Sequence, residues 1–189
     1  MQITTKAIVL SSIKYGDSSL IVKAYTEKEG LQSYLLKGVL NSRKSKIKAA
    51  YFQPLTQLEI VASHKGKGSL EHIREVRVSY HYQSIYSDMA KNAIAIFLTE
   101  VLLKSIGDGE EDLGLFKFLE ASCQWLDTHD QISNFHLYFM IRLSKFLGFF
   151  PDISYADTNY FDLQAGQFVD KAGLNPYLHG TQLFFFKKL

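Results

Sequence analysis

The sequence predicts an α+β protein in which an N-terminal OB-fold β-barrel precedes an α-helical domain. Strand-like runs of β-branched and aromatic residues, separated by glycine-containing turns, fill residues 1–80. After Ser84 the apolar residues recur at the helical period of about 3.6 instead of two. The net charge also changes sign between these two parts. We therefore expect a barrel domain at 1–80 and a helical domain with a small C-terminal hairpin at 81–189.

Five strands are expected in the first part, at residues 6–15, 19–26, 31–37, 55–61 and 70–78. Gly16-Asp17 and Gly30 supply turns in which a positive φ is tolerated. In the fourth run, Leu58 and Ile60 alternate with polar neighbours, as in a strand with one buried face. Five short strands, one of them entered after a long connection, are typical of a small Greek-key barrel such as the OB fold. An SH3-like barrel is the main alternative.

Three helices are expected in the second part. The first ends at Gly107, and its predicted apolar stripe consists of Met89, Ala93, Ile96, Phe97 and Val101. The second covers about 112–128, with Asp112 available as the N-cap. The third is expected to be capped by Ser133 and to end at Gly148, because glycine tolerates the left-handed conformation that terminates many helices.

The chain becomes rich in aromatic and turn residues beyond Pro151. Residues 160–163 and 167–169 flank an Ala165-Gly166 turn and are expected to form a hairpin. The final apolar run at 183–186 requires a packing partner.

The composition is that of an ordinary folded protein, with 47% hydrophobic, 21% charged and 14% aromatic residues. The N-terminus lacks the charged region, apolar run and cleavage site of a signal peptide. No stretch reaches the roughly 18 apolar residues that a membrane span requires. Cys123 is the single cysteine, which excludes an internal disulfide and an all-cysteine metal site. We expect a cytoplasmic protein without a membrane partner.

The formal net charge of +2 conceals a marked asymmetry. Residues 1–80 hold thirteen Lys and Arg against six Asp and Glu, a net charge of +7. Residues 81–189 hold eight Lys and Arg against thirteen Asp and Glu, a net charge of −5. A basic part beside an acidic part indicates a polyanionic partner for the first.

The segment 37–48 is the most informative for function, since it holds five positive charges and no negative one. Such a segment can neutralise phosphates by releasing counterions, without reading bases. OB folds bind single strands by combining a basic groove with aromatic faces on which bases stack. The predicted nucleic-acid-binding residues are Lys37, Arg43, Lys44, Lys46, Lys48 and Tyr34, with Lys14, Lys65 and Lys67 as second candidates on flanking turns. A solvated surface loop is the alternative.

No nucleophile elbow and no metal-ligating histidine spacing is found, so we expect neither an enzyme nor a cofactor. Cys123 lies within a predicted helix, where a buried small hydrophobe is expected. Arg142 interrupts the apolar stripe of the third helix. It is either a structural arginine, paired to a buried carboxylate or capping a carbonyl, or the charged part of a groove that holds an acidic peptide tail. A protein-interaction adaptor is accordingly the alternative function.

Several short segments share their order and spacing with one known family. They are Lys6-Ala7-Ile8-Val9-Leu10, Tyr15-Gly16-Asp17-Ser18-Ser19-Leu20-Ile21-Val22, Thr26 with Gly30, Lys37-Gly38, Ser42-Arg43-Lys44-Ser45, Gln53-Pro54-Leu55, Leu147-Gly148-Phe149-Phe150-Pro151, and Tyr160-Phe161-Asp162-Leu163 with Gly166 and Phe168. Together they span almost the whole chain, and the sequence resembles the bacterial RecO family of DNA repair proteins.

The resemblance implies an OB-fold domain, a helical domain and the role of a recombination mediator, not that of an enzyme. It implies binding of single- and double-stranded DNA, annealing of complementary strands, contact with the single-strand-binding protein, and help to RecR in loading RecA. The basic residues that contact DNA in this family would correspond to Lys37, Arg43, Lys44, Lys46 and Lys48.

Two departures from the family pattern are visible. Many relatives carry a four-cysteine zinc site where this chain has Tyr155, Ala156, Asp157 and Thr158, so no zinc is expected. Relatives also usually continue as further helices, whereas this sequence stops at Leu189. We therefore expect the helical domain to be truncated or divergent at its end.

Overall fold

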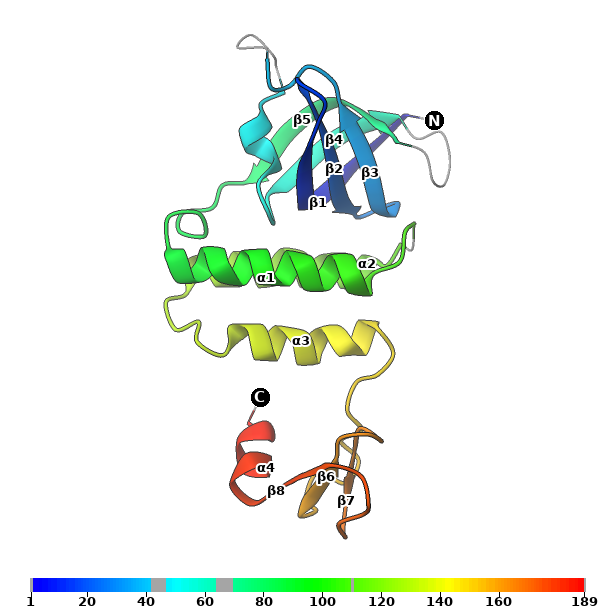
Figure 1. The fold of residues 1–189 in the computed structure, drawn as a ribbon, viewed down its shortest axis with the longest axis vertical. Helices are drawn as coiled ribbons and strands as arrows, with labels where there is room; N and C mark the ends of the chain where they lie inside the picture. Colours follow the sequence, from blue (N-terminus) through cyan, green and yellow to red (C-terminus); the bar gives the residue numbers. More distant parts are fainter. Residues whose placement is uncertain (1, 42–46, 64–69, 110, 189) are drawn as a thin grey trace. The chain divides into compact units, whose positions relative to one another are not determined.

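The computed structural model describes residues 2–41, 47–63, 70–109 and 111–188 (Figure 1). The chain divides into two compact units, Met1–Ile132 and Ser133–Leu189. The first unit contains all the strands of the barrel together with the two helices that follow them. The predicted domain boundary after residue 80 stays a prediction, because the two units reflect how densely the residues contact one another and do not test where a domain ends.

The first unit begins with a five-stranded antiparallel sheet. Its strands are β1 (Gln2–Tyr15), β2 (Ser19–Thr26), β3 (Gly30–Leu36), β4 (Gln57–Ser63) and β5 (His72–Tyr80), and a short 3-10 helix, η1 (Ala49–Phe52), lies between β3 and β4. Their order in the sheet is β3-β2-β1-β4-β5. β1 therefore lies in the middle, hydrogen-bonded to β2 on one side and to β4 on the other.

The two edges of this sheet meet at Glu71, just before β5. The N–H of Leu35 donates to the carbonyl oxygen of Glu71 at 2.8 Å, and the N–H of Glu71 donates to the carbonyl oxygen of Ser33 at 2.9 Å. Tyr34 and Glu71 form a parallel bridge at this point. Antiparallel strands that curl until the third and fifth meet form a partly open Greek-key barrel, so the predicted OB fold and the α+β class are confirmed.

Strands β4 and β5 begin two residues later than predicted. Leu55 has a φ of 63°, which is left-handed rather than extended backbone, so a strand cannot start there. The N–H of Thr56 donates to the carbonyl oxygen of Gln53 at 3.1 Å, which completes a tight turn before β4. The alternation of apolar and polar residues from Leu55 onward does not reveal this turn.

The barrel encloses a core to which all five strands contribute. Its fully buried members are Ala7, Val9, Leu20, Val22, Ala24, Tyr34, Leu36, Val39, Phe52, Leu58, Ile60 and Ala62. Leu20, Val22 and Ala24 of β2 share the inward face. A β-bulge in β1 between Val9 and Ser11 changes which residues of that strand point inward.

Two helices complete the first unit, α1 (Met89–Ser105) and α2 (Leu113–Thr128) (Figure 1). Asp112 caps α2 by accepting from the N–H of Leu115 at 3.0 Å, which confirms the predicted N-cap. The predicted buried stripe of α1 is wrong, because Met89 is 88% exposed and Ile96 is 49% exposed. The helix instead buries a face that includes Lys91, and the buried residues are Lys91, Ala95, Leu98, Thr99 and Leu102.

Lys91 is buried because α2 supplies polar partners for it. Its ammonium donates to the carbonyl oxygen of Asp127 at 2.9 Å and to Oγ of Ser84 at 2.7 Å. The carboxylate of Asp127 accepts from the backbone N–H groups of Gln83, Ser84 and Ile85 at 2.8 to 3.2 Å. One buried aspartate thus fixes the connection between β5 and α1 against the end of α2.

Polar contacts also join α2 to the barrel. The ammonium of Lys6 donates to Oε1 of Glu120 at 2.9 Å. The side chain of Gln57, predicted to face solvent, is buried, because its Nε2 donates to the carbonyl oxygen of Glu120 and its Oε1 accepts from Gln124, both at 3.1 Å. The helices therefore cover part of the barrel and leave the rest of its outer surface open.

The second unit consists of α3 (Phe135–Phe146), three short strands, β6 (Tyr160–Asp162), β7 (Gln167–Val169) and β8 (Tyr177–His179), and α4 (Gly180–Phe186). Strands β6 and β7 form the predicted hairpin, and β8 joins its other side. Within the C-terminal apolar run, Leu183 is buried against Phe161 and Phe168.

The ends of α3 differ in how well they follow the prediction. Asn134, not Ser133, occupies the N-cap position, and no side-chain hydrogen bond caps the helix there. Gly148 ends the helix as predicted, with a φ of 81°. The N–H of Phe149 then donates to the carbonyl oxygen of Ser144 at 3.0 Å.

We expect Asp127→Ala to lower the free energy of unfolding by about 3 kcal/mol, because the backbone N–H groups of Gln83, Ser84 and Ile85 lose their carboxylate acceptor. Urea denaturation followed by Trp125 fluorescence measures this change. Asp170→Ala is the matched control, since that side chain is exposed and should change stability by less than about 0.5 kcal/mol. Equal stabilities of the two variants would contradict the role of Asp127.

The same aspartate should give the stability a defined pH dependence. Burial alone would raise the pKa of Asp127, but hydrogen bonds from Gln83, Ser84 and Ile85 outweigh it and hold the pKa below its ordinary value. The stabilisation is therefore complete above the unfolded pKa of about 3.9 and is lost as pH falls through the lower folded pKa. The stability difference between the wild type and Asp127→Ala should narrow below about pH 4.

Candidate nucleic-acid interface

The barrel presents one open surface, formed by the second half of β1 together with β2 and β3. Directly paired residues on neighbouring antiparallel strands point to the same side of the sheet. The pairs Ile13↔Ile21 and Ile21↔Leu35 make an apolar row, and Ser11↔Lys23 and Lys23↔Ser33 make a polar row beside it. We call this surface the outer face, and its residues are Ser11, Ile13, Tyr15, Ser19, Ile21, Lys23, Ser33 and Leu35.

Large apolar side chains on the outer face are exposed. Ile13 is 63% exposed and Tyr15 is 56% exposed. They point outward because the bulge at Val9/Ser11 shifts the register, so the alternation that carries Ala7 and Val9 inward does not continue. Sequence reasoning missed these residues for that reason, since strict alternation from Ala7 would have buried Ile13 and Tyr15.

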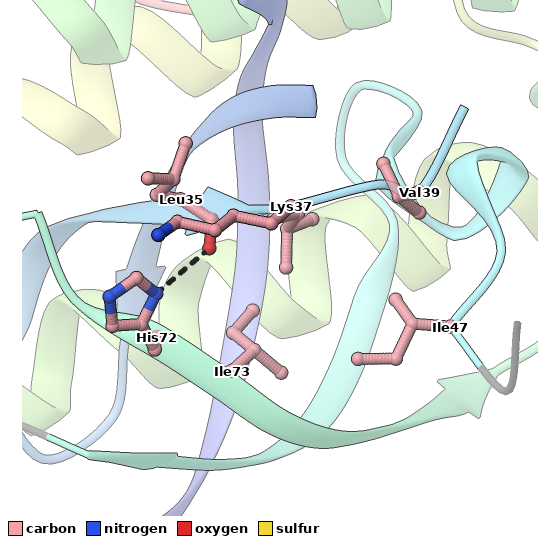
Figure 2. Close-up of a pocket in the computed structure, with 7 residues that line it drawn as sticks. Leu35, Lys37, Val39, Ile47, His72 and Ile73 are labelled. Atoms are coloured by element: carbon pink, nitrogen blue, oxygen red, sulfur yellow. Dashed lines mark hydrogen bonds between the residues drawn. The ribbon is translucent and has the colours of Figure 1, made fainter. Parts of the chain in front are cut away.

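The basic segment begins where the outer face ends. Lys37 follows β3 directly and is exposed, and it lines a pocket of about 230 Å³ (Figure 2). Lys48, also exposed, occupies the N-cap position of η1. Of the other predicted cations, Lys14 is exposed near the end of β1, opposite Leu20, whose side chain points inward. It therefore lies on the other side of β1 from Ile13 and Tyr15.

Five of the predicted contact residues cannot be placed, because Arg43, Lys44, Lys46, Lys65 and Lys67 lie outside the described residues. Lys23, which was not predicted, belongs to the outer face, and Lys37 follows β3 directly. Lys23 could have been found from the sequence, because it alternates with Val22 and Ala24 and therefore points to the other side of the strand.

The prediction that Tyr34 offers a stacking surface is wrong. Tyr34 is fully buried in the barrel core, where its ring packs among the inward side chains of the strands. Burial, with Glu29 and Glu71 nearby, raises the pKa of its phenol well above the ordinary value. Tyr15, in contrast, is exposed on the outer face.

Cys123 and Arg142 are the other residues that the sequence singled out. Cys123 is buried, and burial raises the pKa of its thiol to about 12, so it behaves as the predicted small hydrophobe. Arg142 is exposed on α3, with its guanidinium 5.7 Å from the centre of the Tyr138 ring, and which of its two predicted roles it has stays a prediction.

The described residues offer neither a metal site nor a membrane-spanning helix. Among the described residues, no group of three or more His, Cys, Asp or Glu side chains is arranged to hold a metal ion. No helix in the described part of the chain has the length and apolar character needed to cross a bilayer.

Comparison with known proteins gives a consistent result over both parts of the chain. Residues 1–82 match the family model described as recombination protein O N terminal, and residues 86–178 match recombination protein O C terminal. The DNA repair protein RecO of Flavobacterium psychrophilum is 47% identical over 190 residues, which cover 100% of this chain and 79% of that protein.

Two further relatives carry the same name. RecO of Flavobacterium johnsoniae is 49% identical, with 89% of this chain and 71% of that protein covered. RecO of Bacteroides fragilis is 39% identical, with 95% of this chain and 73% of that protein covered. On the fold, the two family models and these relatives, the chain belongs to the RecO family of DNA repair proteins.

Proposed function

We propose that this protein is a recombination mediator that binds single- and double-stranded DNA, anneals complementary strands, and assists RecA loading together with RecR. It performs no catalytic step, needs no cofactor, and acts in the cytoplasm on the DNA of the nucleoid. The observation that carries the proposal is the outer face, an exposed apolar and aromatic surface that leads directly into the basic segment 37–48.

The chemistry of this surface matches a single DNA strand. The lysines that precede, lie within and follow segment 37–48 attract phosphates whatever the base sequence of the DNA. When a phosphate binds a lysine, counterions condensed on the DNA are released. The ring of Tyr15 and the apolar row of Ile13, Ile21 and Leu35 offer surfaces against which base faces lose contact with water. Duplex DNA offers the same phosphates without exposed base faces, so it would bind mainly through charge.

Annealing follows from this mode of binding. Contacts to the sugar-phosphate backbone position a strand without fixing which bases face the protein. Neutralised phosphates also lower the repulsion between two strands that approach each other. The product duplex can no longer use the outer face for its bases, which favours its release.

A second candidate function, protein binding, is favoured by Arg142. Its exposed guanidinium lies over the Tyr138 ring on α3, an arrangement suited to a carboxylate beside an apolar side chain. We propose that this pair receives an acidic peptide tail such as that of the single-strand-binding protein. In a pure adaptor, this contact would operate without any DNA binding by the barrel.

Removing cations of the described interface should weaken DNA binding and its dependence on salt. For Lys23→Ala/Lys37→Ala/Lys48→Ala we expect the slope of log affinity against log salt for single strands to become shallower by about two, because each lost phosphate contact removes roughly 0.7. Affinity over a salt series, with strand annealing measured in parallel, tests the proposal.

The matched control for this triple variant is Lys104→Ala/Lys117→Ala/Lys171→Ala, which removes the same charge from exposed positions elsewhere. If both variants had the same slope and annealing rate, net charge and not the interface would account for binding. Failure of the wild type to bind or anneal DNA would overturn the proposed function.

The stacking role assigned to Tyr15 has a separate signature. Tyr15→Ala should reduce single-strand affinity about tenfold without changing the salt slope, since one stacked base is lost but no phosphate contact. Tyr15→Phe should keep near wild-type affinity, because the ring face remains. Fluorescence anisotropy with a labelled oligothymidylate measures both variants, and equal losses in Ala and Phe would argue against stacking.

The acidic-tail proposal can be tested on the intact protein with a peptide that ends in several aspartates. Arg142→Ala should weaken peptide binding about tenfold and leave DNA affinity unchanged, since charge-assisted hydrogen bonds are among the strong ones. Lys145→Ala on the same helix is the charge-matched control and should bind like the wild type. Equal peptide affinity of the wild type and Arg142→Ala would exclude this site.

A further inference from the structure

A pocket of about 230 Å³ lies where the edge of the barrel closes (Figure 2). β3 contributes Leu35 and Leu36, the start of β5 contributes His72 and Ile73, and the connection after β3 contributes Lys37, Val39 and Ile47. The backbone hydrogen bonds of Glu71 with Leu35 and Ser33 hold two of these walls together. The pocket therefore sits on a fixed part of the barrel, beside the outer face and at the start of the basic segment.

Five of the seven lining side chains are aliphatic, but polar atoms make up more than half of the exposed lining. Figure 2 shows the branched side chains of Val39, Ile47 and Ile73 around one space, with Lys37 and His72 also on its lining. Val39 is 7% exposed and packs on the barrel core, whereas Lys37 is exposed. Such a lining suits an occupant with flat apolar faces, a polar edge and a negative charge nearby.

The hydrogen bond of His72 determines what its ring can offer. Its Nδ1 lies 3.2 Å from the carbonyl oxygen of Leu35, and a carbonyl oxygen can only accept. Nδ1 therefore carries the proton, and Nε2 of the neutral ring is an acceptor. Lys37 adds up to three donors, which every nucleobase can accept through a ring nitrogen or carbonyl oxygen.

We propose that this pocket takes one unpaired nucleobase of a bound single strand, while Lys37 holds an adjacent phosphate. This assignment rests on the proposed DNA binding and specifies how a strand is anchored. The volume is smaller than the roughly 300–1,000 Å³ of pockets for drug-sized ligands, which fits one ring system. An aliphatic peptide side chain would fill the walls but would leave Lys37 without an anion.

Charge complementarity supports a nucleotide as the occupant. Lys37 follows the pocket residue Leu36 in the chain, and Lys48 follows the pocket residue Ile47. Both chain segments that line the pocket here therefore carry a cation next to it. A strand that follows these cations keeps its phosphates outside and can turn one base inward. The ammonium of Lys37 and the ring of His72 offer donors and an acceptor that any base can use, so little sequence preference is expected.

The anchor distinguishes single strands from duplex, because a base in the pocket cannot be paired at the same time. A protein filled at this pocket should therefore lose affinity for single strands and keep its affinity for duplex. During annealing, the base held in the pocket would pair with the complementary strand later than the bases next to it. Its withdrawal from the pocket would accompany release of the finished duplex.

The test is Ile47→Trp, which fills the pocket, measured with an oligothymidylate and with a duplex of equal length. We expect single-strand affinity to fall about tenfold, the order that one stacked base contributes, with unchanged duplex affinity and salt slope. Val61→Trp, on an outward position of β4 away from the pocket, is the matched control and should bind both DNAs like the wild type. Equal single-strand affinity in Ile47→Trp and Val61→Trp would overturn the pocket assignment.

A second measurement uses the wild type, so it does not depend on how a variant folds. A strand that carries 4-thiothymidine should cross-link on irradiation to peptides containing Lys37 or His72, and excess unlabelled oligothymidylate should abolish the product. Cross-links confined to other peptides would overturn the proposal although DNA binding persisted, whereas absence of all DNA binding would refute the proposed function itself. Specific competition by an aliphatic acidic peptide, with no effect of oligothymidylate, would instead identify a protein-binding pocket.

Discussion

The two backbone hydrogen bonds between Glu71 and β3 are the constraint on which the rest of the first unit depends. Without them the sheet would have two free edges and its inward side chains would line an open trough. With them, the edges meet and twelve side chains are enclosed as one core. The bonds use main-chain atoms, so they specify the geometry of closure and not the chemistry of the surface outside it. That surface is consequently open to functional residues.

The barrel divides its surface between two uses. The side that carries Lys6 and Gln57 is occupied by α2 through hydrogen bonds to Glu120 and Gln124. The side formed by the second half of β1, β2 and β3 keeps exposed apolar side chains such as Ile13 and Tyr15. Contiguous exposed apolar patches often mark interaction sites, and this is the surface to which we assign the proposed DNA binding. The bulge in β1 separates the two uses along a single strand.

The sequence was sufficient for the fold and only partly sufficient for the site. Turn glycines, alternation and the Asp112 cap predicted the barrel strands and α2, because these signals are local. The left-handed turn at Leu55, the bulge after Val9 and the buried Lys91 depend on partners that are distant in sequence. Tyr34 was misassigned because alternation shows that a strand has two faces but not which one a closed barrel buries. The charge pattern identified a basic segment, whereas the geometry of closure was needed to find the pocket beside it.

The arrangement around Asp127 has a consequence for how this family can vary. Its carboxylate serves three successive backbone N–H groups, and its carbonyl oxygen serves Lys91, which also needs Ser84. Replacement of Lys91 by an apolar residue would leave the oxygens of Asp127 and Ser84 with one donor fewer in a buried place. Substitutions at 84, 91 and 127 should therefore occur together in related sequences, and intermediates with only one change should be rare. Residues of the outer face share no such buried partner, so packing does not couple their substitutions to one another.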